Sequence, residues 1–207
     1  MLKRNIPACA LLFGMFALTA SAQRTPDLRP GNFELGLYGG ASYGVDSFRP
    51  MGGVNLSYSL PKLLLPYVEF SYFPEILRDY VQGDKGGTLS ARLIDFHGGV
   101  HVRFIQRESR VVPYGVIGFG VLNSHTTGIS KPLQTAGLTQ AQIDALSSRV
   151  DIKSNDPAVN FGGGLRVYHT SAFGYRAEFK LYRPVSGQFT KVFTKTEGGI
   201  FFQFGGR

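Results

Sequence analysis

The stretch IDFHGGVHVRF at residues 94–104 is the clearest indication of the fold, because apolar and polar side chains alternate along it. Its apolar residues are Ile94, Phe96, Val100, Val102 and Phe104, and its ionisable residues are Asp95, His97, His101 and Arg103. A period of two residues is typical of a β-strand, because successive side chains point to opposite faces. The stretch therefore predicts a strand with one apolar face and one polar face.

Seven other segments show the same alternation, so the pattern predicts eight strands. Their apolar faces begin at Phe33, Val54, Val68, Ile117, Val159, Phe173 and Ile200. Each segment has roughly 8 to 13 residues, close to the 9 to 11 that a tilted strand needs to cross a bilayer. The ionisable residues on the opposite faces are Glu34, Glu69, Asp95, His97, His101, Arg103, Arg166, Arg176, Glu178 and Lys180.

The connections between these segments differ in length, and the odd-numbered ones are mostly the longer ones. Outer-membrane barrels have short periplasmic turns and longer external loops. If the N-terminus lies in the periplasm, residues 79–87 and 123–157 belong to external loops, and residues 169–172 form a tight periplasmic turn.

The N-terminus has the three-part layout of a secretory signal peptide. Lys3 and Arg4 precede an apolar run from Ile6 to Thr19, and Ala20-Ser-Ala22 supplies the cleavage site. The alternative is a transmembrane helix, but the run has about 14 residues and a helix needs about 20 to cross a bilayer. We therefore predict a signal peptide at residues 1–22, a periplasmic segment at 23–32 and a barrel domain at 33–207.

The composition argues against several other classes. Lys and Arg number 22 and Asp and Glu 14, but the basic residues are scattered among acids, whereas nucleic-acid binding needs a clustered basic face. Exposed Lys and Arg could instead meet phosphate groups of surface lipid or polysaccharide. The single cysteine, Cys9, lies within the predicted signal peptide, so neither a disulfide nor thiol chemistry is expected in the mature chain.

Alternation alone does not decide which face points inward. The signal peptide, the loop lengths and the glycines on the polar face favour a membrane barrel with a polar lumen, because a small barrel has little interior room. The alternative is a soluble periplasmic barrel of lipocalin-like shape that binds an apolar ligand. We predict an all-β protein, an eight-stranded antiparallel up-and-down transmembrane β-barrel with a short helix in the third external loop.

Several motifs resemble the outer-membrane β-barrel families that include the OmpA and OmpX types. They are PYGVIGFGV at 113–121, FGGGLRVY at 161–168, FGYRAEF at 173–179 and IFFQF at 200–204. The resemblance implies contact with outer-membrane lipid and lipopolysaccharide, and assembly by machinery that recognises an aromatic residue at the end of the last strand. In this chain three residues follow that aromatic residue, Phe204, which departs from the family pattern.

The ten ionisable residues on the polar faces are predicted to form a paired network that fills the lumen, because unpaired buried charges are costly. The alternative is a narrow ion path. His97 and His101 would lie about 13 Å apart on one strand, too far to ligate one metal ion. The glycine clusters lie within strands rather than before a helix, so no nucleotide site is expected. We predict no cofactor and no metal.

Ser124 and His125 in the third external loop, with Asp144, Asp151 or Asp156, are the candidates for nucleophilic catalysis. Neighbouring residues point in different directions on a strand, and no G-x-S-x-G motif is present. We therefore predict a non-enzymatic barrel with a role in envelope structure or surface contacts. The alternative is a lipid-modifying enzyme.

The third external loop also contains a helix signal. Thr139 and Gln142 have the spacing of a capping box, with Leu138 and Ile143 as its hydrophobic staple. We predict a short amphipathic helix over Gln140 to Arg149 that covers the barrel mouth, or alternatively contacts a partner or lipid. Aromatic residues near strand ends predict an interfacial girdle. They are Tyr43, Tyr58, Tyr67, Tyr72, Phe104, Phe173, Tyr182 and Phe204.

Overall fold

The structure is a computed structural model, which describes residues 31–44, 48–60, 63–82, 85–104, 110–132, 137–185 and 192–205. The predicted signal peptide at 1–22 and most of the periplasmic segment lie outside the described residues.

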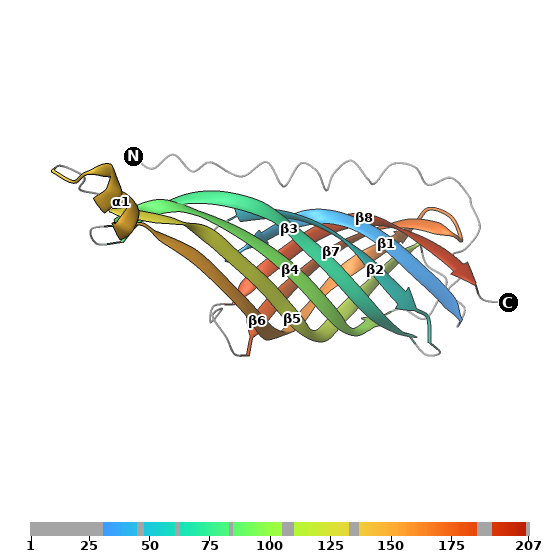
Figure 1. Cartoon of the computed structure of the whole chain (residues 1–207). Helices are drawn as coiled ribbons and strands as arrows, with labels where there is room; N and C mark the ends of the chain where they lie inside the picture. The colour runs from blue at the N-terminus through green and yellow to red at the C-terminus, as the bar shows by residue number, and fades with distance from the viewer. Residues whose placement is uncertain are drawn as a thin grey trace, which may run out of the picture.

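The described chain forms a closed barrel in which each strand pairs with its sequence neighbour and β1 pairs with β8, always antiparallel (Figure 1). This confirms the predicted eight-stranded up-and-down barrel. In chain order the elements are β1 (Asn32–Tyr43), β2 (Phe48–Tyr58), β3 (Leu64–Gln82), β4 (Lys85–Arg103), β5 (Val111–Pro132), α1 (Gln140–Leu146), β6 (Ser148–Tyr168), β7 (Phe173–Pro184) and β8 (Phe193–Gly205).

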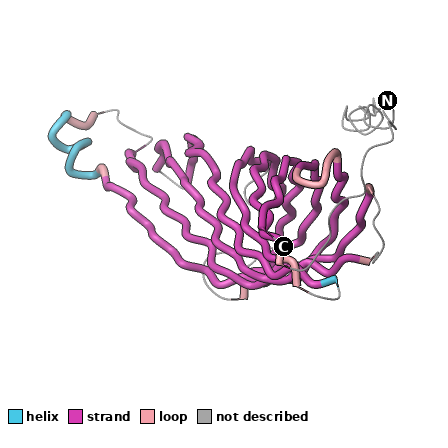
Figure 2. Tube along the Cα trace, turned by 90° about the vertical axis from the view of Figure 1, so that its right-hand side faces the viewer, coloured by secondary structure: helices cyan, strands magenta, loops and turns pink. Residues whose placement is uncertain are grey.

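The four central strands are much longer than the sequence predicted. β3 to β6 have 19 to 22 residues each, whereas β1, β2, β7 and β8 have 11 to 13. Residues 79–82 and 85–87 are therefore strand rather than flexible loop, and much of the predicted loop 123–157 belongs to β5 and β6. Cross-strand pairing continues as far as Gln82 with Lys85 and Ser130 with Ser148. These paired segments, residues 74–82, 85–92, 123–132 and 148–156, form a four-stranded extension of the wall. Figure 2 shows that one side of the barrel reaches further than the other.

Helix α1 starts where the sequence predicted but ends three residues early. The capping box is present, because Thr139 accepts from the backbone N–H of Gln142 and the Gln142 side chain accepts from the backbone of Thr139. The helix ends because Ser147 is extended and β6 begins at the next residue. No residue of α1 is buried, and the helix sits at the tip of the β5–β6 hairpin (Figures 1 and 2). The prediction that this helix covers the barrel mouth is therefore wrong.

The polar face points inward and the apolar face outward, which favours the membrane barrel over the soluble one. On β5, Phe119 is 57 % exposed, whereas Tyr114 on the other face is buried. Outward apolar residues on this strand run from Val111 to Val121. At about 3.3 Å per residue and a tilt of about 40°, that stretch is about 25 Å high, the usual height of the apolar band in such barrels.

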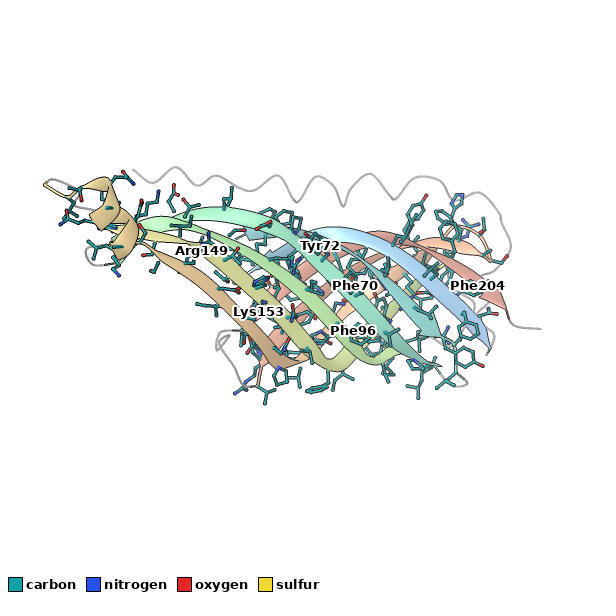
Figure 3. All side chains as sticks on the ribbon, in the orientation of Figure 1. Phe70, Tyr72, Phe96, Arg149, Lys153 and Phe204 are labelled. Carbon is teal, nitrogen blue, oxygen red and sulfur yellow. The ribbon has the colours of Figure 1, made fainter. Side chains whose placement is uncertain are left out.

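Two residues assigned to the aromatic girdle lie elsewhere. Tyr67 and Tyr182 are buried in the lumen, because each falls on the inward phase of its strand. Phe204 lies at the other end of the barrel from α1 (Figure 3). Phe33 packs against Tyr58 and Phe204, with ring centroids 4.8 and 5.8 Å apart. Among the described residues, no helix is long and apolar enough to cross a bilayer.

Glycines on the inward face make room for the lumen tyrosines. A Cβ on Gly118 would lie 2.5 Å from the Tyr67 hydroxyl and 2.9 Å from Asn160 Oδ1. A Cβ on Gly53 would likewise overlap the ring of Tyr38. The tyrosine rings therefore fill space that only glycine leaves free on the neighbouring strands.

Candidate functional site

The lumen holds all ten ionisable residues that the sequence assigned to the polar faces, each buried to 3 % exposure or less. Four further charged side chains lie there: Arg49, Asp156, Lys195 and Glu197. Sequence reasoning missed these four because the predicted strands were too short. Continuing the two-residue period of β8 back from Gln203 reaches Glu197 and Lys195. Among the described residues, six buried cationic side chains balance six buried carboxylates.

Lys180 is the centre of the middle layer of the lumen. Its ammonium lies 2.7 Å from both carboxylate oxygens of Glu69, 2.6 Å from Glu178 and 2.7 Å from Glu197. These residues come from β3, β7 and β8. Because all four are buried, the contacts hold strands that are far apart in the sequence around one cation.

Lys195 extends this layer toward the end of the barrel that carries α1. Its ammonium donates to Glu69 at 3.1 Å, to Asp95 at 2.8 Å, to Ser71 at 2.7 Å and to Tyr182 at 3.0 Å. Asp95 also contacts His97 Nδ1, and His97 Nε2 donates to the carbonyl of Ala158 at 3.3 Å. The layer therefore also includes β4 and β6.

A second layer lies nearer the opposite end of the barrel, where β1 begins and β8 ends. Arg166 donates from Nε and from Nη2 to Glu34 Oε1, both at 3.1 Å. Its guanidinium stacks 4.1 Å from the centroid of the Tyr114 ring and lies 2.8 Å from His101 Nδ1. The His101 ring stacks on Tyr67 with centroids 4.2 Å apart. Charged groups and aromatic rings together fill this part of the lumen.

The structure separates the histidines that raised the question of a metal site. His97 lies in the layer of Lys195, whereas His101 lies in that of Arg166. Among the described residues, one set of three carboxylates has atoms within 4.8 Å of one another: Glu69, Glu178 and Glu197. The ammonium of Lys180 contacts all three. The Lys180 ammonium occupies the place where a metal ion would bind. The three carboxylates therefore suit an ammonium, and we assign no metal to them.

The catalytic candidates do not come together. Ser124 and His125 lie in β5 rather than in a loop, and they point to opposite faces. Ser124 faces the lumen and is 8 % exposed, whereas His125 faces outward, 2.9 Å from Asp151. Asp156 lies in the lumen and accepts from Ser154, and Asp144 in α1 accepts from the Gln140 amide. No Ser–His pair forms in this part of the barrel.

Solved structures of outer-membrane barrels share the fold. The N-terminal β-barrel domain of Pseudomonas aeruginosa OprF is 15 % identical, with a TM-score of 0.52 over 84 % of this chain and 99 % of that chain. OprG from Pseudomonas aeruginosa is 9 % identical, with a TM-score of 0.52 over 89 % and 99 %. Ail, the attachment invasion locus protein of Yersinia pestis, is 13 % identical, with a TM-score of 0.49 over 85 % and 100 %.

No protein-family model and no curated protein sequence matches the chain. The likeness to the solved structures is therefore one of fold. The closed barrel with its polar lumen and apolar outer band has the fold of small outer-membrane β-barrels, which is the fold that the sequence motifs predicted.

Proposed function

We propose that the chain is an integral outer-membrane barrel, exported through a cleaved signal peptide, with a non-enzymatic role in envelope structure and contacts at the cell surface. The extension of β3 to β6 beyond the apolar band carries this proposal. It raises α1 away from the membrane with no residue of the helix buried. A role confined to spanning the membrane would need no such extension.

The filled lumen supports the structural part of the proposal. Side chains with little or no solvent exposure fill its two charged layers, and they join strands on opposite sides of the barrel. The partners we propose are outer-membrane lipid, lipopolysaccharide, the barrel-assembly machinery during insertion, and a surface ligand at the extension.

Location and orientation can be tested together. We would insert an epitope between Gly137 and Leu138 beside α1, and in a matched variant between Thr170 and Ser171 in the β6–β7 turn. We expect the protein in the outer-membrane fraction. On gel electrophoresis, its band should migrate differently in boiled and unboiled samples. The first epitope should be accessible on intact cells, and the second only after permeabilisation. Soluble periplasmic protein, or reversed accessibility, would contradict the proposal.

The surface role has its own test. Replacing residues 131–147 by an Asn-Gly turn removes α1 and leaves Ser130 and Ser148, the last pair of the β5–β6 ladder, on either side of a two-residue hairpin loop. We expect the boiling-dependent shift and the membrane location to stay as in the wild type. Binding of cells to host or bacterial surfaces, compared with a strain that lacks the protein, should be lost. Unchanged surface binding would argue that the extension is not the contact region.

The separation of Ser124 from His125 supports the absence of enzymatic activity. Lipid A would be compared by mass spectrometry in the wild type, the deletion strain, and strains carrying Ser124→Ala or His125→Ala. We expect the same lipid pattern in all four. A pattern that changes on deletion and is restored by the wild type, but by neither variant, would establish the lipid-modifying alternative.

A further inference from the structure

The outward face of the wall changes from apolar to polar at one level. On β5 the outward side chains are apolar up to Val121, and the next two are Asn123 and His125. Across the sheet, His125 pairs with Arg92 on β4 and with Lys153 on β6. These three side chains form the basic row, which runs across three strands and spans about 10 Å at the usual strand spacing.

The height of the basic row places its backbone just above the lipid headgroups, within reach of its long side chains. It lies four residues beyond Val121, about 13 Å along the strand and about 10 Å above the apolar band after allowing for tilt. The headgroup zone is about 5 to 8 Å thick on each side of the hydrocarbon. Arg and Lys side chains are long enough to reach back to that zone. In Figure 3, Arg149 and Lys153 lie toward α1, and Phe70, Tyr72 and Phe96 lie further along the wall.

The arginine and lysine side chains of this face have no partner among the residues that the structure describes. Arg92 and Lys153 are exposed, as are Arg149 and Lys131 above them, and none makes a hydrogen bond or ion pair with any described residue. The carboxylates on the same face are already engaged. Asp151 contacts His125 at 2.9 Å, Asp79 accepts from Thr88 at 2.9 Å, and Glu75 accepts from Ser90. The face therefore presents free cations to an external anion.

The residues around the basic row suit a sugar phosphate better than a bare phosphate. Asn123 and Asn155 lie one row below, joined at 2.6 Å, and Thr127 lies one outward position above His125. Their amide and hydroxyl groups can exchange hydrogen bonds with sugar hydroxyls, while Arg and Lys bind phosphate oxygens. Apolar side chains below, such as Phe96, can contact acyl chains. This order of acyl, sugar and phosphate contacts is that of a phosphorylated glycolipid lying against the wall.

We propose that the outward face of β4 to β6 binds a phosphorylated glycolipid of the outer leaflet, with Arg92 and Lys153 holding its phosphate groups. The inference rests on the proposed outer-membrane location and orientation. It assigns a specific lipid partner to one side of the barrel. The glycolipid would then surround the base of the extension and fix its direction relative to the membrane.

The test uses the full-length protein and the double variant Arg92→Gln with Lys153→Gln. The matched control is Lys85→Gln with Arg183→Gln, which removes the same charge from exposed positions outside the basic row. Each protein would be placed in phosphatidylcholine nanodiscs, and one of three lipids would be titrated in. The lipids are lipopolysaccharide, the same lipopolysaccharide after phosphatase treatment, and phosphatidylglycerol. Bound lipid would also be counted by mass spectrometry after mild extraction.

We expect binding of lipopolysaccharide about tenfold weaker for the Arg92/Lys153 variant and close to wild type for the control, since charge-assisted contacts are lost. The wild type should lose affinity when the glycolipid is dephosphorylated and when salt is raised. Equal binding by the wild type and the Arg92/Lys153 variant would overturn the proposal. So would equal affinity for phosphatidylglycerol, which would indicate a general anionic surface.

Failure of this inference can be distinguished from failure of the proposed function. A protein that fractionates as soluble, or with α1 in the periplasm, would remove the outer-membrane assignment itself. If every variant reaches the outer membrane and shifts on boiling, but lipid binding does not change, only the glycolipid site is wrong.

Discussion

Replacing Arg166 by Met should destabilise the barrel strongly while leaving its shape intact. Arg166 is fully buried and makes two 3.1 Å hydrogen bonds to Glu34. No other described cation is bonded to Glu34. Removing one partner of a buried ion pair costs about 3 to 5 kcal/mol, because the remaining charge is left uncompensated. Met is of similar length and apolar, so the cavity left behind is small.

The pair can be isolated with a double-mutant cycle. Glu34→Gln alone leaves Arg166 without its carboxylate, and the double variant removes both charges. We expect the double variant to lose less stability than the sum of the single variants, with a coupling free energy of about 2 kcal/mol or more. The control is Arg183→Met on the exposed face of β7, where the change should be within about 0.5 kcal/mol.

The assay is urea unfolding of barrels folded in lipid vesicles. The folded fraction would be measured by gel electrophoresis of unboiled samples, in which folded and unfolded protein give separate bands. Linear extrapolation to zero urea then gives the free energy of unfolding. If Arg166→Met folds and unfolds within about 0.5 kcal/mol of the wild type, the ion pair does not stabilise the lumen and the reasoning is refuted.

Three further predictions concern other parts of the structure. Lys180→Met removes the cation shared by three carboxylates and should cost at least about 3 kcal/mol in the same assay, with partial recovery in Lys180→Arg; no loss would contradict the charged layer. Gly118→Val forces Tyr67 to move and should lower the free energy of unfolding by about 1 to 3 kcal/mol. Gly39→Ala on the outward face should be as stable as the wild type. Equal stabilities of the two variants would argue against the close contact between Gly118 and Tyr67. Thr139→Ala removes the cap of α1 and should speed amide hydrogen exchange in its first turn without changing urea unfolding of the barrel; slow exchange retained in the variant would show that the cap is dispensable.

The class of the fold and most of the charged residues of the lumen could be predicted from the two-residue alternation. Alternation is a local property, since each side chain's face follows from its position in a strand of period two. That is why the ten residues from Glu34 to Lys180 could be assigned to one face, and why the capping box at Thr139 located the start of α1. The outward apolar face, long enough to span a bilayer, followed from the same pattern.

The lengths of the strands and the partners of the lumen charges depend on tertiary contacts. In the extension, residues 126–129 are partly or largely exposed on both faces, so they need no apolar alternation, and pairing with neighbouring strands holds them instead. This placed Ser124 and His125 on opposite faces of β5 rather than in a loop. The contacts of Lys180 with Glu69 and Glu197 depend on the register with which the sheet closes on itself. Closure of the barrel brings together side chains that are far apart in the sequence, and the local alternation does not predict which of them will meet.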